Sequence, residues 1–169
     1  MISIGLNGFG RIGKCVFLQL IYNNNIDIKV INAPDYDINN LESYLKRDSV
    51  HQYNKNFSIT IIDNDTFEIN GKSIHIMRNR NACELSWKKY NIDHIIDATG
   101  VYLTQEKAKQ HDVNYVVMSA PPKDDTPQFV YGANDQCYNG EKIISNASCT
   151  TNCITPILRH LQEHYGIKQ

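Results

Sequence analysis

Hydrophobic and polar positions along this chain predict strands and helices in turn. A β-rich run at residues 3–6 precedes a glycine-rich turn, and residues 11–22 then carry apolar side chains at helical spacing. Residues 27–33 read as a second strand, and residues 38–45 as a second helix with one apolar side. This succession is typical of a parallel sheet whose strands are joined by crossover helices.

The middle of the chain follows a different pattern. Runs at residues 58–62, 67–69 and 73–77 are strand-like, and the Asn70-Gly71 pair is a strong hairpin signal. We therefore expect an antiparallel meander inserted between the parallel units. Parallel alternation then resumes, with strands at residues 94–97, 115–118, 129–131 and 143–144 and helices at residues 104–111 and 149–165. The predicted fold is α/β, a Rossmann-type, doubly wound, mostly parallel sheet that contains the meander.

Composition narrows the class of protein. The chain has 17 Lys and Arg against 18 Asp and Glu, so its charge gives no long-range attraction to nucleic acid or to an anionic membrane. The apolar run that starts at Cys15 is too short to span a membrane, and Arg11 and Lys14 interrupt any secretion signal. The five cysteines form no C-x-x-C pair, which argues against a disulfide framework or a zinc knuckle. We expect a cytoplasmic protein with free thiols and no nucleic-acid or membrane partner.

The glycine-rich turn, Gly8-Phe9-Gly10-Arg11-Ile12-Gly13, fits the pattern G-x-G-x-x-G between a predicted strand and a predicted helix. In this pattern Gly8 allows a tight turn, Gly10 lets the backbone approach a pyrophosphate, and Gly13 lets the helix pack closely. The helix start offers N–H groups and a partial positive charge to phosphates. The alternative, a glycine-rich turn without a ligand, stays open.

Such a fingerprint has an acidic residue about 20 positions further on, whose carboxylate binds a ribose 2′-hydroxyl. Here Ala33 stands where the carboxylate is expected, and Asp35 follows beyond a proline. Loss of the carboxylate removes the charge that repels a 2′-phosphate, yet no Lys or Arg lies between Lys29 and Lys46 to attract one. We therefore expect weakened discrimination between NAD and NADP.

A second informative stretch runs from Asn146 to Cys153, where small polar residues surround Cys149 at the start of the last predicted helix. The partial positive charge at a helix N-terminus favours a thiolate, which is the nucleophilic form. Cys149 is therefore a candidate for covalent catalysis. The alternative is a buried structural cysteine at a capped helix start. Cys153 lies one turn further on and is expected to be packed.

A metal site on this helix is disfavoured. The candidate ligands are Cys149, Cys153, His160 and His164. Cys153 and His160 are separated by roughly 10 Å along a helix axis. Zinc ligands lie only about 2.0–2.3 Å from the metal, so one ion does not reach all four side chains. We expect no metal at this place.

Together the two stretches resemble the phosphorylating glyceraldehyde-3-phosphate dehydrogenase family, of which erythrose-4-phosphate dehydrogenase is a close relative. Asn7-Gly8-Phe9-Gly10-Arg11-Ile12-Gly13 is similar to the opening signature, and Ser145-Asn146-Ala147-Ser148-Cys149-Thr150-Thr151-Asn152-Cys153 to the active-site signature. The stretches Asp48-Ser49-x-His51, Ala98-Thr99-Gly100-Val101 and Ser119-Ala120-Pro121 follow in the family's order. The resemblance implies a dinucleotide-binding domain over residues 1–148 and, at 149–169, the first helix of a catalytic domain.

By this resemblance the thiolate of Cys149 attacks a sugar-phosphate aldehyde, hydride passes to the nicotinamide, and inorganic phosphate cleaves the thioester. Ser148 and Thr150 match phosphate-binding positions, and Ala33 matches the family's acidic ribose ligand. The implied cofactor-binding positions are Asn7, Gly8, Phe9, Gly10, Arg11, Ile12, Gly13, Ala33, Arg80, Thr99, Gly100 and Ser119.

The resemblance covers only the first half of a family member. It implies that the histidine base and most of the catalytic domain lie beyond residue 169, so we expect these 169 residues alone to have little turnover. It also implies a homo-oligomer for an intact full-length protein, and an apolar helix face, at 149–165, that is exposed here. Three alternatives stay open: a stand-alone dinucleotide-binding module, a fragment of an erythrose-4-phosphate dehydrogenase, and a reactive thiol that is modified without turnover.

Overall fold

A computed structural model describes residues 1–48, 50–51 and 57–168. Within these residues the strands form one eight-stranded sheet in the order β3-β4-β5-β2-β1-β6-β7-β8. The strands are β1 (Ile2–Asn7), β2 (Ile26–Asn32), β3 (Ile59–Ile61), β4 (Thr66–Ile69), β5 (Lys72–Met77), β6 (His94–Asp97), β7 (Tyr115–Met118) and β8 (Ile143–Ser145). The α-helices are α1 (Arg11–Leu20), α2 (Leu41–Lys46), α3 (Gln105–Ala108) and α4 (Cys149–Tyr165). Short 3₁₀ turns cover Ile38–Asn40, Ala82–Glu84, Trp87–Tyr90, Lys109–His111 and Asp135–Cys137.

The predicted fold class is confirmed. From β5 to β8 every neighbouring pair of strands is parallel, and β3, β4 and β5 pair antiparallel. The meander arises where the Asn70-Gly71 turn, with both residues at positive φ, joins β4 to β5. Strand β5 closes the meander and also pairs with β2, so the inserted unit extends the parallel sheet rather than standing apart from it.

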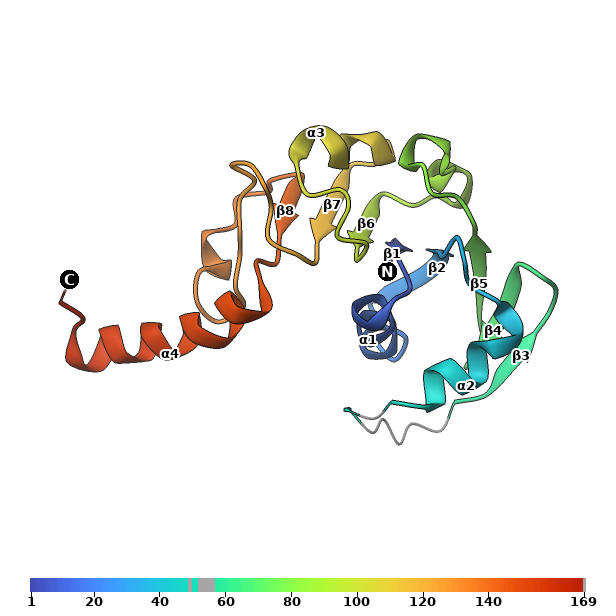
Figure 1. Cartoon of the computed structure of the whole chain (residues 1–169), viewed down its shortest axis with the longest axis horizontal. Coiled ribbons are helices and arrows are strands. Elements are labelled where there is room, and N and C mark those ends of the chain that lie inside the picture. Colours follow the sequence, from blue (N-terminus) through green and yellow to red (C-terminus); the bar gives the residue numbers. More distant parts are fainter. Residues whose placement is uncertain (49, 52–56, 169) are drawn as a thin grey trace.

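Helices cover both faces of the curved sheet. Figure 1 shows α1 and α2 inside the curve, and α3 with the neighbouring 3₁₀ turns along its outer side. The inner core is built on Phe17 and Leu18 of α1, Leu41 and Leu45 of α2, and Phe67 of β4, all fully buried. Because α1 and α2 bury one apolar side against the strands, the carboxyl ends of the parallel strands are left free to carry polar chemistry.

One predicted strand, at residues 129–131, is wrong. A single bridge joins Gln128 to Ser145, with the Ser145 amide donating to the Pro127 carbonyl and the Phe129 amide donating to the Ser145 carbonyl. The backbone then turns at Gly132, where φ is +75°. Hydrophobic residues alone produced the strand pattern, but the pairing ends after one residue on each side.

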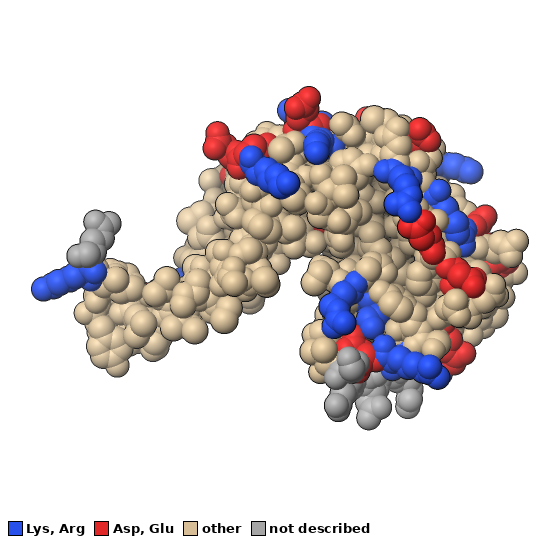
Figure 2. Space-filling model, in the orientation of Figure 1, with Lys and Arg blue, Asp and Glu red and all other residues tan. Residues whose placement is uncertain are grey.

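Helix α4 has the predicted bounds and ends at Gly166, which has a positive φ. No residue of this helix is buried, and Figure 1 shows it extending away from the sheet. Ile154, Ile157, Leu158 and Leu161 are 40–52% exposed, as expected for an apolar helix face with nothing packed on it. Figure 2 shows few charged side chains along α4 on the visible face. Among the described residues, no helix has the length and apolar character that crossing a bilayer requires.

Candidate functional site

The glycine-rich turn connects β1 to α1 at the carboxyl edge of the sheet. Gly8 has a φ of +94°, a conformation that side chains with a Cβ rarely adopt, and its amide donates to the Asn32 carbonyl (2.9 Å). Gly10 caps α1, no side chain caps this helix, and a Cβ on Gly10 would have no atom within 4 Å. The backbone at the first turn of α1 is therefore accessible from the side where Gly10 lacks a side chain.

Gly13 has the opposite surroundings. A Cβ at this position would lie 2.0 Å from the carbonyl oxygen of Gly8 and 3.6 Å from the Cβ of Ala98. The first turn of α1 is thus in contact with the glycine turn and with the segment that follows β6. The sequence interpretation of Gly13 as a close-packing position agrees with this geometry.

A pocket of about 280 Å³ lies against this turn. Its lining comes from Phe9 and Gly10 and from the segment after β2, residues 33–36. Phe9 packs edge-on against Tyr36, with ring centroids 5.3 Å apart, and the Tyr44 hydroxyl donates to the Phe9 carbonyl (2.9 Å). Burial raises the pKa of the Tyr36 phenol well above its usual range, so this wall of the pocket stays uncharged.

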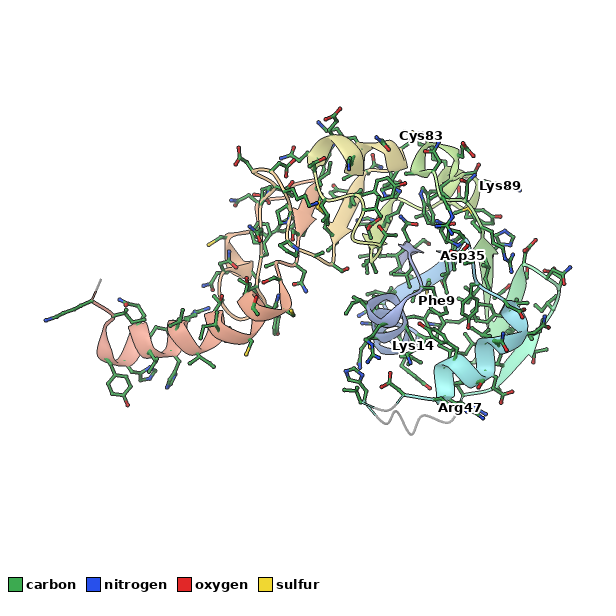
Figure 3. The ribbon with its side chains drawn as sticks, in the orientation of Figure 1. Phe9, Lys14, Asp35, Arg47, Cys83 and Lys89 are labelled. Carbon is green, nitrogen blue, oxygen red and sulfur yellow. The ribbon has the colours of Figure 1, made fainter. Side chains whose placement is uncertain are left out.

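An ion pair stands at the rim of the pocket. Nη2 of Arg80 lies 2.7 and 2.6 Å from the two carboxylate oxygens of Asp35, and both side chains are 76% exposed. Ala33 is buried and its amide donates to the Met77 carbonyl (2.8 Å). Figure 3 shows Asp35 near Phe9 at this end of the molecule. The carboxylate that is missing at position 33 is thus present two residues later, but it is paired with an arginine.

A chain of buried side-chain hydrogen bonds crosses the ends of β2, β1 and β6. Asn32 donates to the Asn7 side-chain oxygen (2.7 Å), and Asn7 donates to Asp97 (2.7 Å). The same carboxylate of Asp97 accepts from the backbone amide and hydroxyl of Thr99 (3.1 and 2.7 Å) and from Nε2 of His111 (3.2 Å). These bonds fix the last residues of three strands relative to one another.

Of this network the sequence interpretation named Asn7 and Thr99 but missed Asn32, Asp97 and His111. A signal was present for two of the missed residues, because Asn32 and Asp97 are polar last residues that each follow a pair of apolar residues in their strand. The partners of such residues are set by the strand order, which local pattern does not reveal. Thr99 and Gly100 follow β6, and Ser119 follows β7 with its amide donating to the Asp97 carbonyl (2.9 Å).

Cys149 is exposed at the first position of α4. The preceding residue, Ser148, caps the helix by accepting from the Thr151 amide (3.0 Å), and its hydroxyl lies 2.9 Å from that of Thr150. Ala147 is buried with a φ of +56°, an unusual conformation for a residue with a Cβ. The Ala147 amide donates to the Ser145 hydroxyl (2.9 Å), which itself donates to the Ala120 carbonyl (2.8 Å). These contacts set the direction in which the chain enters α4.

The expectation that Cys153 is packed is wrong, because α4 extends away from the sheet and Cys153 is exposed with the rest of the helix. Cys149 is likewise exposed in this chain rather than buried. Strands β1 and β8 are parallel and three strand spacings apart, or about 14 Å at roughly 4.8 Å per spacing. The glycine turn after β1 and Cys149 after β8 therefore lie along the same edge of the sheet.

Comparisons with known proteins agree with this geometry. The family model described as glyceraldehyde 3-phosphate dehydrogenase, NAD binding domain, matches residues 2–105. The chain is 40% identical over 171 residues to a glyceraldehyde-3-phosphate dehydrogenase of Bacteroides fragilis, covering 99% of this chain and 51% of that protein. It is 42% identical over 171 residues to the cytosolic glyceraldehyde-3-phosphate dehydrogenase of Leishmania mexicana, covering 99% and 50%.

A third relative, the glyceraldehyde-3-phosphate dehydrogenase of Buchnera aphidicola, is 43% identical over 173 residues, which cover 98% of this chain and 50% of the relative. The chain thus spans about half the length of the curated relatives it matches. Since the family model covers more than half of the chain, and the strand order is that of a Rossmann-type sheet, this chain belongs to the glyceraldehyde-3-phosphate dehydrogenase family and carries its NAD-binding domain.

Proposed function

We propose that this chain provides the NAD-binding domain and the catalytic nucleophile of a phosphorylating glyceraldehyde-3-phosphate dehydrogenase. The observation that carries the proposal is the placement of an exposed cysteine, at the first position of α4, on the same sheet edge as the glycine-turn pocket. The names of its relatives support a sugar-phosphate aldehyde as substrate and inorganic phosphate as co-substrate.

The residues around the glycine turn fit a dinucleotide. The open side of Gly10 and the uncapped first turn of α1 suit a pyrophosphate, which would accept hydrogen bonds from backbone amides there. The pocket beside Phe9 and Ala33 suits the adenosine end. The distance of about 14 Å from the glycine turn to the residues after β8 is within the length of an extended dinucleotide. Thr99, Gly100 and Ser119 line the route between them.

A bound NAD would supply the hydride acceptor, and this chain would supply the nucleophile and the hydroxyls beside it. The thiolate of Cys149 forms a bond to the aldehyde carbon, which gives a thiohemiacetal and, after loss of hydride, a thioester that phosphate cleaves. The hydroxyls of Ser148 and Thr150, 2.9 Å apart beside the helix N-terminus, provide donors for a phosphate oxygen. The division at residue 148 between a cofactor domain and a catalytic domain is part of this proposal.

The cofactor preference is proposed to be relaxed. Without a carboxylate at position 33, the 2′-position of the ribose meets a buried methyl group and an Asp35 carboxylate that Arg80 already neutralises in part. Arg80 is exposed and its guanidinium can instead pair with a 2′-phosphate. We therefore propose NAD as the cofactor with NADP as an accepted alternative.

The proposed location is the cytoplasm, because the Leishmania mexicana and Trypanosoma brucei relatives are named cytosolic, while an Arabidopsis thaliana relative is named chloroplastic. We also propose that the longer protein is a homo-oligomer. This follows from the family resemblance alone, because the exposed apolar side of α4 is expected to pack on the rest of the catalytic domain in the longer protein.

Two measurements on the 169-residue chain test the proposal. Calorimetric titration with NAD is expected to show binding, which a Gly10→Val variant weakens at least tenfold without lowering the melting temperature. Peptide mapping after brief alkylation at neutral pH is expected to show faster modification of Cys149 than of Cys153, although both are exposed on one helix. Equal rates at the two cysteines would show that Cys149 is not activated, and would favour the alternative of a dinucleotide-binding module without catalysis. Absence of NAD binding would overturn the proposal as a whole.

A further inference from the structure

Three potential metal ligands converge outside the cofactor site, between α1 and the segment that follows α2. They are the sulfur of Cys15, a carboxylate oxygen of Asp48 and Nδ1 of His51, and these atoms lie within 4.8 Å of one another. The distance from Sγ of Cys15 to Nδ1 of His51 is 3.8 Å, and from that nitrogen to Oδ1 of Asp48 it is 3.3 Å. In the part of the chain that the structure describes, this is the one group of its kind.

The geometry distinguishes an ion site from a proton relay. In a relay the thiol and the carboxylate contact different nitrogens of the imidazole, so that a proton taken on one side is balanced on the other. Here Nδ1 of His51 faces both the sulfur and the carboxylate. The three donor atoms lie close enough together to share one cation as its ligands.

The spacings match a small thiophilic ion. With a zinc–sulfur distance of about 2.3 Å and zinc–nitrogen and zinc–oxygen distances of about 2.0–2.1 Å, the edges of a tetrahedron are about 3.3 Å from nitrogen to oxygen and about 3.6 Å from nitrogen to sulfur. The first edge equals the observed separation, and the second is reached when the nitrogen–sulfur distance shortens by about 0.2 Å. The third edge, from sulfur to the Asp48 oxygen, is about 3.6 Å around zinc, and these two atoms lie within 4.8 Å of each other. Sulfur and imidazole ligands also disfavour Mg²⁺ and Ca²⁺, which prefer oxygen.

The carboxylate is held in place before any ion binds. Oδ1 of Asp48 accepts from the backbone amides of Val50 and His51 (both 2.9 Å), and Oδ2 pairs with Nζ of Lys14 (2.9 Å). Only 4% of the Asp48 side chain and 7% of the Lys14 side chain are exposed. These contacts orient the carboxylate, and because Oδ1 already accepts two amide bonds they also compete with a cation for that oxygen.

Nearby positive charge sets a limit on the affinity. Lys14 shares the charge of Asp48, and Arg11 and Arg47 line an adjoining pocket of about 360 Å³ with them. Figure 3 shows Lys14 and Arg47 at this end of the molecule, and Figure 2 shows basic side chains gathered there. Repulsion from these groups predicts micromolar binding rather than the tighter binding of a structural zinc site.

We propose that Cys15, Asp48 and His51 bind a thiophilic divalent cation, Zn²⁺ in the first instance, with water at the fourth position. The Cys15 thiol releases its proton to solvent as the sulfur–metal bond forms. His51 binds through the lone pair of Nδ1 and carries its proton on Nε2. Cys15 lies on α1 and the other two ligands follow α2, so the ion ties these two elements together.

Cobalt substitution tests the site directly. In a chain with Cys83, Cys137, Cys149 and Cys153 replaced by serine, Cys15 is the remaining thiol. Addition of Co²⁺ is expected to produce a sulfur-to-cobalt charge-transfer band and visible bands of tetrahedral intensity, which Zn²⁺ then abolishes. Cys15→Ser and His51→Gln are expected to lose both sets of bands, whereas the control His160→Gln, on α4, retains them.

A second readout does not depend on whether these variants fold. In the chain with native Cys15, Zn²⁺ is expected to slow alkylation of Cys15 at least tenfold and to raise the melting temperature, while Mg²⁺ changes neither. Cobalt bands that persist in Cys15→Ser would overturn the proposal, as would an alkylation rate of Cys15 that millimolar Zn²⁺ leaves unchanged.

Discussion

Replacing Gly13 by alanine tests whether the glycine turn is held by close packing. The added Cβ would lie 2.0 Å from the Gly8 carbonyl oxygen and 3.0 Å from the Gly8 carbonyl carbon. Both are backbone atoms of the turn, so no flexible side chain is available to move aside. Either α1 shifts along the sheet or the turn opens, and each movement disturbs the surface to which a pyrophosphate would bind.

The size of the effect follows from two opposing contributions. Alanine favours a helix over glycine by about 1 kcal/mol, which stabilises the variant. Forcing an extra methyl group into a packed region costs about 1–3 kcal/mol, and more when the obstacle is backbone. Because the contact is about 1 Å too short, we expect the clash to lie at the upper end of this range and, after the helix term of about 1 kcal/mol is subtracted, to lower the free energy of unfolding by about 1–2 kcal/mol. For a chain of this length that corresponds to a fall in melting temperature of about 2–8 °C.

Thermal melting and titration with NAD measure the two consequences together, and Gly10→Ala is the matched control. Position 10 has a negative φ and no atom within 4 Å of the place where the added methyl group would lie. Alanine there is therefore expected to leave the melting temperature within about 1 °C of the parent value. The Gly13→Ala variant is expected to lose both stability and NAD affinity. The Gly10→Ala variant is expected to lose NAD affinity and to keep its stability. If Gly13→Ala melts like the parent and binds NAD equally well, the close contact does not fix the turn.

Three further variants test other parts of the site. Ala33→Asp restores a carboxylate at the end of β2 and is expected to weaken NADP binding at least tenfold relative to NAD in calorimetry; an unchanged ratio would show that Asp35 already sets the preference. Asp97→Asn leaves the buried donors of Asn7, Thr99 and His111 without a charged acceptor and is expected to cost about 1.5–3 kcal/mol in urea unfolding, whereas a loss below about 1 kcal/mol would contradict the network. Burial lowers the pKa of the His75 imidazole in the folded chain below the value of about 6.5 expected when the chain is unfolded. The unfolded chain therefore binds a proton on His75 more tightly, and the free energy of unfolding falls as the pH drops through about 6.5. The urea midpoint of His75→Gln is expected to vary less than that of the parent between about pH 7.5 and 5.5, and equal slopes would refute the assignment.

Local pattern predicted the elements well because most strands and helices here bury one side against a common core. Helix α4 was predicted to the residue, since its apolar spacing is regular and Gly166 ends it. The error at residues 129–131 has the same origin. Of this apolar run only Val130 is buried and Tyr131 is exposed, and the pairing of a strand depends on a partner edge, where Ser145 offers one bridge.

Long-range contacts of polar residues were beyond the reach of the sequence. Cys15 and His51 are 36 residues apart, and Asn7 and Asp97 are 90 apart, so nothing in their local surroundings indicates that they meet. The glycine turn and the Cys149 helix start were found because each has a compact local pattern with a physical function. Their common position at one sheet edge required the strand order.

The two parts of the site depend on the fold in different ways. The glycine turn is fixed from several sides, by the Asn32–Asn7–Asp97 hydrogen bonds and by the contact of α1 with Gly8. Cys149 is positioned by the residues that precede it, while α4 buries no residue and is tied back to the sheet side through Arg159, whose Nη1 donates to the carbonyls of Gly132 and Ala133 (2.8 and 2.9 Å). Changes at Ser148 or at Arg159 should therefore alter the reactivity of Cys149 while leaving NAD binding intact, whereas loss of Asp97 should weaken cofactor binding and stability together. This separation follows from the structure, since the buried hydrogen bonds centred on Asp97 do not extend to the helix that carries the thiol.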